Sequence, residues 1–184
     1  MADPNTIGKG DDEWMTPAWF FKELDDEFYF TVDGAASHAN ALCTRYCTIE
    51  GTFQVVGDRD EGTYYAQKIS DADGLSYEGE EGDVIFVNPP YSHPLVRQFV
   101  EHWSRVGTTL PNRTVVMLLR PFVDTHTFHD FIWDEKNHCE RPGVKVRFRQ
   151  GRVAFVNPDP DRQRVQPPGG NMVVVFRNAE KHST

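Results

Sequence analysis

The region that most restricts the fold of this chain lies between residues 83 and 120. Two apolar runs, VIFV at 84–87 and TVVMLL at 114–119, are rich in β-branched residues and have the length of buried strands. Between them, PLVRQFVEHWSRV at 94–106 repeats its apolar residues three and four apart, as one face of a helix requires. Strand, helix and strand in this order favour an α/β sheet with parallel neighbours.

Other segments extend this pattern. TPAWFFKELDDEF at 16–28 predicts a helix that the Thr16 side chain caps, and FTVD at 30–33 predicts a short strand. Residues 37–46 are expected to form a short helix or loop.

The last third of the chain is rich in β-forming residues. VKVRFRQGRVAFV at 144–156 resembles a hairpin with its turn near 150–151, and NMVVVFR at 171–177 predicts a final strand. The sheet is therefore expected to be mainly parallel, with an antiparallel C-terminal hairpin.

The length of 184 residues suits one domain. We expect a disordered tail over 1–12, a single domain over 13–178 and a short tail over 179–184. The uneven stretch 48–68 is interpreted as an insertion in that domain.

Charge is unevenly distributed along the chain, whose formal net charge is −9. Residues 1–96 hold 5 basic and 19 acidic side chains, whereas residues 97–152 hold 10 basic and 6 acidic ones. The acidic total argues against a nonspecific nucleic-acid coat, and a polyanion would be met by the basic segment.

Several classes of protein are not expected. No apolar run of about 18 residues predicts a membrane span, and the N-terminus lacks the apolar core of a secretory signal. Three cysteines are too few and odd in number for a disulfide framework, so a cytoplasmic location is expected. No metal site is expected, because the spacing of these side chains matches zinc sites poorly: Cys43, Cys47, His138 and Cys139.

The run VIFV ends abruptly in Asn88, Pro89, Pro90 and Tyr91. Ligands of open α/β sheets bind beyond the carboxyl ends of strands. The prolines stiffen the backbone, so the Asn88 side chain and the Pro89 carbonyl can act as a fixed pair of acceptors, and Tyr91 offers a flat face. These groups suit a planar molecule with an exocyclic amine, whose two hydrogens the acceptors would take. The alternative is that Asn-Pro-Pro only ends the strand and forms a turn.

In the segment 88–91 the sequence resembles the amino-methyltransferases that use S-adenosylmethionine (SAM), whose motif is [DNSP]PP[YFW]. More closely, it resembles the phage-type DNA N6-adenine methyltransferases. The segments that carry this resemblance span about 12–177 and are DEWMTP at 12–17, FTVDGAASHANALCTRY at 30–46, DGL at 73–75, NPPYS at 88–92, GRVAF at 151–155 and NMVVVF at 171–176. The chain departs from the family pattern in lacking a glycine-rich FxGxG loop, for which GAAS stands in, and in having Gly34 where Ala is common.

The resemblance implies a compact Rossmann-like fold, SAM as cofactor and DNA as substrate. Asn88, Pro89, Pro90 and Tyr91 would hold a flipped adenine, with Tyr91 stacked on it. The residues implied for the cofactor are Trp14, Thr16, Pro17, Asp33, Ala35 and Asp73.

DNA contacts are expected from the basic segment. In VKVRFRQGR basic residues alternate with apolar ones, so one face of a strand would be basic. The predicted DNA-contacting residues are Ser92, Arg141, Lys145, Arg147, Arg149 and Arg152. The alternative for these side chains is a solubilised sheet edge.

The sequence thus predicts a SAM-dependent, site-specific DNA adenine-N6 methyltransferase, encoded by a phage or prophage and acting in the bacterial cytoplasm. Family membership suggests protection from host restriction as its purpose. The alternatives are methylation of cytosine N4 or of a glutamine amide, and a non-enzymatic DNA-binding module that retains the fold.

Overall fold

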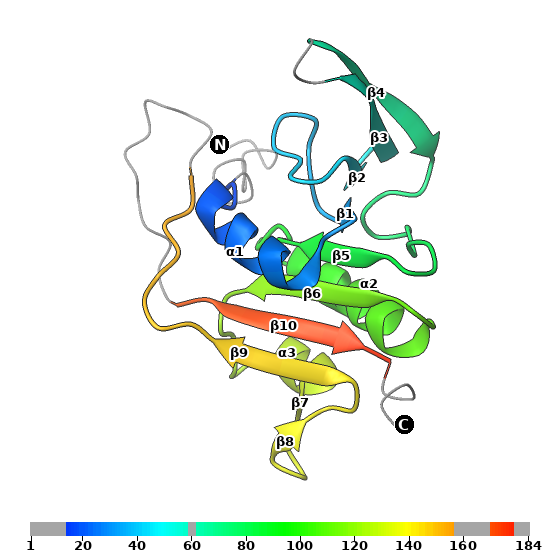
Figure 1. Ribbon diagram of the computed structural model, residues 1–184. Helices are drawn as coiled ribbons and strands as arrows, with labels where there is room; N and C mark the ends of the chain where they lie inside the picture. The colour runs from blue at the N-terminus through cyan, green and yellow to red at the C-terminus, as the bar shows by residue number, and fades with distance from the viewer. Residues whose placement is uncertain (1–13, 59–61, 157–169, 179–184) are drawn as a thin grey trace, which may run out of the picture.

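The computed structural model describes residues 14–58, 62–156 and 170–178. Its centre is an eight-stranded sheet with the strand order β4-β3-β2-β1-β5-β6-β10-β9 (Figure 1). The helices are α1 (Ala18–Phe28), α2 (Leu95–Thr109) and α3 (His126–Phe131). The sheet strands are β1 (Val32–Asp33), β2 (Arg45–Thr48), β3 (Gly51–Asp58), β4 (Thr63–Ser70), β5 (Val84–Val87), β6 (Thr114–Leu119), β9 (Val144–Phe148) and β10 (Met172–Arg177). A separate pair is formed by β7 (Trp133–Asp134) and β8 (Cys139–Glu140).

The four central strands are parallel and both outer parts of the sheet are antiparallel. β1 pairs in parallel with β2 and β5, and β5 with β6, whereas β3, β4, β9 and β10 join through antiparallel pairings. The α/β class is confirmed, and the sheet is mixed, with a parallel centre and antiparallel strands at the C-terminal side as well as in the β3–β4 hairpin. Because β1, β5 and β6 run the same way, their carboxyl ends meet at one edge of the sheet.

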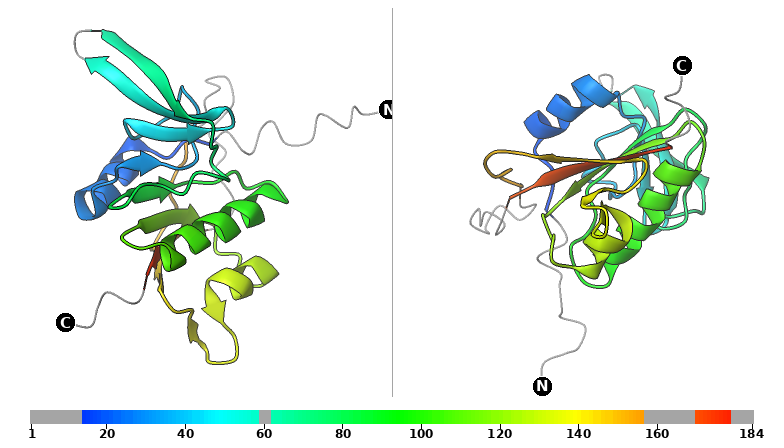
Figure 2. Two further views of the ribbon diagram at one scale, coloured as in Figure 1. Left: turned by 90° about the vertical axis from the view of Figure 1, so that its right-hand side faces the viewer. Right: turned by 90° about the horizontal axis from the view of Figure 1, so that it is seen from below.

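Helices cover the two faces of the sheet (Figure 2). Phe20 and Leu24 of α1 pack in one core cluster with Phe86, and Trp103 of α2 packs in the other with Ile85. The two faces of β5 are thus buried on opposite sides, as the period of two in a strand requires. No helix in the described part of the chain is long and apolar enough to span a membrane.

The hairpin of β3 and β4 extends the sheet beyond β2 and occupies most of the stretch 48–68. Its outer strand β4 is exposed along its length except at Ser70. Strand β2 was not predicted, since RYCT at 45–48 overlaps the segment interpreted as a short helix or loop. The predicted tails over 1–12 and 179–184 lie outside the described residues.

Two local predictions are wrong. Thr16 does not cap α1: the N-cap is Pro17, and no side chain bonds the free N–H groups there. The stretch 144–156 is not a hairpin, because β9 pairs with β10. Strand β10 is apolar on both faces, so it lies between β6 and β9, and Val153 and Phe155 instead join the core cluster beneath α1.

Candidate active site

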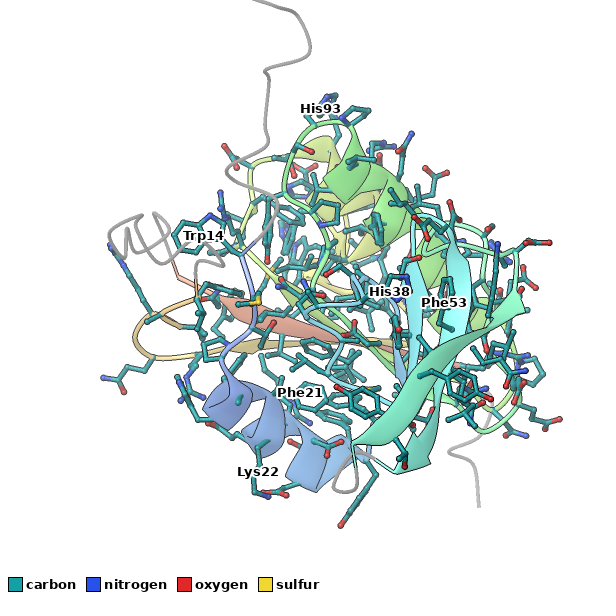
Figure 3. All side chains as sticks on the ribbon, turned by 90° about the horizontal axis from the view of Figure 1, so that it is seen from above. Trp14, Phe21, Lys22, His38, Phe53 and His93 are labelled. Carbon is teal, nitrogen blue, oxygen red and sulfur yellow. The ribbon has the colours of Figure 1, made fainter. Side chains whose placement is uncertain are left out.

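The segment Asn88–Tyr91 follows β5 at the carboxyl edge and contributes to two cavities that share no lining residue among those the structure describes. The Asp33 cavity, of about 510 Å³, includes Asn88 and Pro90 in its wall. The Tyr91 cavity, of about 770 Å³, includes Tyr91 and Arg120. His93 of the Tyr91 cavity and Lys22 of α1 lie on opposite sides of the molecule, and Trp14 of the Asp33 cavity lies at the left margin of the same view (Figure 3).

The Asp33 cavity is built from the ends of β1, β2 and β5 together with the loop at 73–75. Its size falls in the range of small-molecule sites, and apolar side chains such as Leu42, Phe86 and Phe99 form much of its wall. His38, which packs on Phe53 with ring centroids 4.6 Å apart, supports the adjoining strands β2 and β3 (Figure 3).

Asp33 supplies a buried carboxylate at the end of β1. Its Oδ1 accepts from the Ala35 N–H at 3.2 Å, and its Oδ2 accepts from the Leu42 N–H at 3.1 Å. Burial raises the pKa of Asp33 to about 6, although these two hydrogen bonds oppose the shift. The carboxyl group therefore carries a charge at neutral pH in a wall that is otherwise largely apolar.

Thr16 lines the same cavity and is only 7% exposed. Its Oγ1 has no hydrogen-bond partner among the described residues. A buried hydroxyl without a partner costs roughly 1–3 kcal/mol. The Thr16 hydroxyl is therefore available to a ligand of the Asp33 cavity.

Two glycines bring backbone segments together behind this wall. A Cβ on Gly34 would lie 2.7 Å from the Trp103 ring, and a Cβ on Gly74 would lie 2.7 Å from the Gly34 carbonyl oxygen. The glycine at 34, noted as a departure from the family pattern, is therefore required by the close approach of α2.

Asn88 and Tyr91 are held by backbone carbonyls. The Asn88 Nδ2 donates to the Trp14 carbonyl at 3.3 Å, and the Tyr91 hydroxyl donates to the Leu118 carbonyl at 2.8 Å. The Tyr91 hydroxyl also lies 3.4 Å from the Asn88 Oδ1. Burial raises the pKa of Tyr91 well above its usual value, so the hydroxyl stays a neutral donor. These bonds leave the Asn88 Oδ1 as an acceptor with a single long contact.

Most residues predicted for the cofactor come together. Trp14, Thr16, Asp33, Ala35 and Asp73 all line the Asp33 cavity, whereas Pro17 does not. The Asp73 Oδ1 accepts from the Leu75 N–H and the Ser76 hydroxyl, so this carboxylate also fixes its own loop.

The residues predicted for DNA are dispersed, and most are bonded within the protein. Lys145 pairs with Glu140 at 2.8 Å, Arg147 with Glu27 at 2.7 Å and Arg149 with Glu23 at 2.6 Å. Arg147 and Arg149 also stack on aromatic rings of α1. Arg152 is exposed, and Ser92 lines neither of the two cavities.

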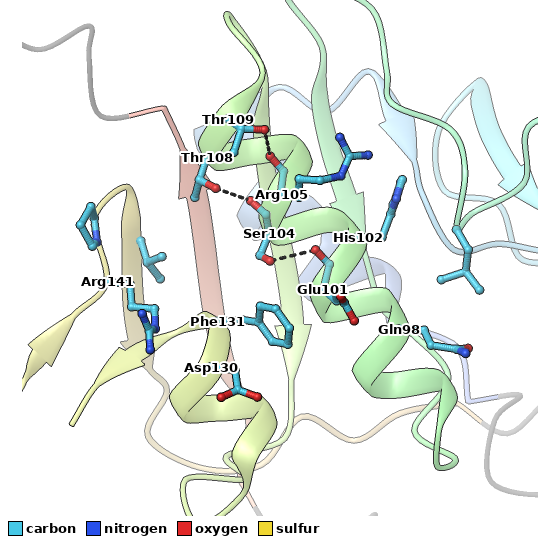
Figure 4. A pocket seen from close by; sticks show the side chains of 13 residues that line it. Gln98, Glu101, His102, Ser104, Arg105, Thr108, Thr109, Asp130, Phe131 and Arg141 are labelled. Atoms are coloured by element: carbon cyan, nitrogen blue, oxygen red, sulfur yellow. Dashed lines mark hydrogen bonds between the residues drawn. The ribbon is translucent and has the colours of Figure 1, made fainter. Parts of the chain in front are cut away.

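Arg141 lies on the face of the sheet that α2 and α3 cover. It lines a third cavity, of about 760 Å³, between these two helices (Figure 4). Its Nε and Nη2 donate to the His129 carbonyl at 2.9 and 2.7 Å. In the same wall, Ser104 and Thr108 bond to carbonyls of α2 itself. This cavity shares Leu75 with the Asp33 cavity and Asp130 with the Tyr91 cavity, but none of Asn88–Tyr91.

Sequence reasoning missed three contributors to the site. Thr48, at the end of the unpredicted strand β2, and Ile49, in the turn after it, line the Asp33 cavity. Ile49 is 95% exposed. Arg120 follows β6, and its guanidinium carbon lies 4.5 Å from the centre of the Tyr91 ring. Its place directly after a central apolar strand was a usable signal, because parallel strands deliver their ends to one edge.

An α/β sheet with a small-molecule cavity and an Asn-Pro-Pro-Tyr segment at its carboxyl edge is the arrangement expected of an amino-methyltransferase. The sequence profile of the family described as DNA N-6-adenine-methyltransferase (Dam) matches residues 3–56 and 57–184. A DNA N-6-adenine-methyltransferase of Haemophilus phage HP1 (strain HP1c1) is 27% identical over 179 residues, covering 96% of this chain and 84% of that protein. The chain therefore belongs to the DNA N-6-adenine-methyltransferase family, and it is an adenine-specific DNA methyltransferase.

Proposed function

We propose that the protein binds SAM in the Asp33 cavity and methylates the N6 of an adenine flipped out of DNA onto Asn88–Tyr91. The observation that carries this proposal is the position of Asn88–Tyr91 at the boundary of the Asp33 cavity. The parallel centre of the sheet, with β10 antiparallel between β6 and β9, supports a Rossmann-like fold for the enzyme.

The residues of the Asp33 cavity fit SAM. Asp33 and Asp73 offer carboxylates to its hydroxyl and amino groups, the unpartnered Thr16 hydroxyl offers a further polar contact, and Leu42 and Phe99 offer apolar surface. SAM supplies a methyl group that is already electrophilic, so the protein needs no metal to activate it.

The protein must also position the adenine amine for the transfer. In the proposed complex the Asn88 Oδ1 and the Pro89 carbonyl oxygen accept its two hydrogens, which turns the nitrogen lone pair away from the ring and toward the Asp33 cavity. The bond from Asn88 Nδ2 to the Trp14 carbonyl fixes which side-chain atom faces the base. The bond from the Tyr91 hydroxyl to the Leu118 carbonyl fixes the ring on which the base stacks.

Nucleoside mass spectrometry of DNA from an expressing host, with methylation-aware sequencing, tests this function. The expected product is N6-methyladenine at a recurring sequence. N4-methylcytosine would replace the proposed base specificity. Unmodified DNA, together with no SAM binding by calorimetry, would contradict the proposal.

A further inference from the structure

We propose that Arg120 binds a phosphate of the target strand beside the flipped base. The inference rests on the proposed placement of the adenine at Asn88–Tyr91. Arg120 follows β6 at the same edge at which Asn88–Tyr91 follows β5. The backbone therefore delivers this cation to the catalytic segment.

Among the described residues, the guanidinium of Arg120 contacts an aromatic ring and no anionic side chain. It lies 4.5 Å from the Tyr91 ring centre, and no hydrogen bond or ion pair of its side chain occurs within the described residues. An arginine has five N–H donors in a planar fork that matches a phosphate. A partly buried guanidinium that has no acceptor among the described residues can bind an external anion.

The carboxylates that line the Tyr91 cavity with Arg120 do not form an ion pair with its guanidinium. Asp130 of the Tyr91 cavity is bonded to Arg97 at 2.9 Å. Asp124 lines the cavity but is exposed and forms no ion pair with Arg120. Arg120 thus differs from Arg147 and Arg149, whose charges are already met by glutamates of α1.

A phosphate is the anion that the reaction brings to this place. The target nucleotide rotates about its own backbone when its base leaves the duplex, so a phosphate follows the base to the protein. A base stacked at Tyr91 would carry its phosphate to the edge of the Tyr91 cavity, where Arg120 lies. Arg120 would thereby hold the extruded nucleotide at its backbone while Tyr91 holds its base.

The salt dependence of DNA binding measures such a contact. Each phosphate neutralised contributes about 0.9 to the slope of log K against log salt for duplex DNA. We expect Arg120→Ala to make the slope shallower by about 0.9, and Arg120→Lys to keep it. The probe is a short labelled duplex that contains the methylated sequence, with binding followed by fluorescence anisotropy.

Arg113 provides a matched control at the other end of the same strand. It precedes β6 at the amino edge, and its guanidinium donates to the Gly79 and Pro111 carbonyls. Arg113→Ala removes the same charge and should leave the slope unchanged. Equal slopes for the two alanine variants would overturn the proposal.

A second measurement identifies the phosphate. Duplexes in which single phosphates near the target adenine are replaced by neutral methylphosphonates should bind the wild-type protein more weakly at one position. The Arg120→Ala variant should be insensitive at that position. If Arg120→Ala keeps the full slope but loses turnover at saturating DNA, Arg120 acts only through Tyr91, and the phosphate role is wrong.

Two readouts separate this inference from the proposed function and from misfolding. SAM binding in the Asp33 cavity should be unchanged in Arg120→Ala, and its thermal unfolding should remain cooperative. Failure of the proposed function would appear in the wild-type protein, as DNA without N6-methyladenine, whereas failure of the phosphate contact would appear only in the variants.

Discussion

The carboxyl edge of the sheet and the face covered by α1 differ in how their polar side chains are satisfied. At the edge, the Thr16 hydroxyl and the Arg120 guanidinium have no hydrogen-bond partner within the described residues. Under α1, Arg147 and Arg149 bond to glutamates and stack on aromatic rings. The basic side chains of β9 therefore contribute to the fold, whereas the unpaired groups at the edge are available to ligands.

Asn88→Ala should have the largest effect. Loss of a preorganised polar contact to the reacting group typically costs about 10²–10³-fold in turnover. SAM binding by calorimetry should remain, because the Asp33 cavity keeps its other residues. Asn137→Ala, on an exposed turn bonded to Asp134, is the control and should retain activity. Unchanged turnover in Asn88→Ala would remove the catalytic role of this edge.

Gly34→Ala tests whether the backbone behind the Asp33 cavity tolerates a side chain. Its Cβ would meet the Trp103 ring at 2.7 Å and Val87 at 3.0 Å, and overpacking of this kind costs about 1–3 kcal/mol of unfolding free energy. Gly170→Ala, whose Cβ would meet no described residue within 4 Å, should be close to neutral. Thermal unfolding of the two variants gives the comparison, and equal stability would contradict the close approach.

The pKa of Asp33 predicts how SAM binding varies with pH. If the ionised carboxylate binds SAM, affinity should be about tenfold weaker at pH 5 than at pH 7.5, because the pKa is about 6. The Asp33→Asn variant should show a flat profile in calorimetry. A wild-type profile equally flat would show that Asp33 is structural.

The same shift has a defined sign for stability. The folded state takes up the Asp33 proton below about pH 6, whereas the aspartate carboxyl of the unfolded chain, with its ordinary pKa of 3.8, does so only at lower pH. Within that window the folded state binds more protons, so the contribution of Asp33 to the free energy of unfolding decreases as pH rises.

Thr16→Val replaces the unpartnered hydroxyl by a methyl group and keeps the shape of the side chain. Stability should stay the same or rise, and SAM affinity should fall by about 1 kcal/mol, the usual worth of one hydrogen bond. Thr52→Val is the opposite case, because the Thr52 hydroxyl donates to the Ala72 carbonyl at 2.6 Å and is fully buried. That variant should lose stability and keep its SAM affinity. If Thr16→Val loses stability instead, its hydroxyl serves the fold.

Arg147→Ala should have the smallest effect. Its side chain and that of Glu27 are about half exposed, and such pairs contribute roughly 0.2–1 kcal/mol. The salt dependence of DNA binding should not change. A shallower slope would support the DNA role that the alternating basic pattern of β9 predicts.

The centre of the site was predictable because it depends on local sequence. An apolar run followed by two prolines marks the end of a buried strand, so Asn88 and Tyr91 could be placed at the edge of a sheet. Asp33 follows another strand, and the parallel pairing of β1 with β5 brings the two ends together. The fold class followed from the same alternation of strands and helices.

The rest depends on contacts between distant segments. The pattern in VKVRFR predicts a basic face, but the acidic side chains of α1 that meet it lie 120 or more residues earlier in the chain. Strand β10 takes the place beside β9 because of its own apolar composition, which no feature of 144–156 reveals. The stacking of Arg120 on Tyr91 likewise arises only when β5 and β6 are neighbours.

The separation of the Asp33 and Tyr91 cavities has a kinetic consequence. If the donor binds in the Asp33 cavity and the nucleic acid at the Tyr91 cavity, as proposed, the two reach the segment Asn88–Tyr91 by separate routes, because the cavities have no described lining residue in common. In that arrangement spent cofactor would leave without passing the DNA, and we expect one encounter with the duplex to modify several sites in succession. On a substrate with two target sites, present in excess over the enzyme, doubly methylated molecules would then form from the start of the reaction, without prior accumulation of singly methylated ones.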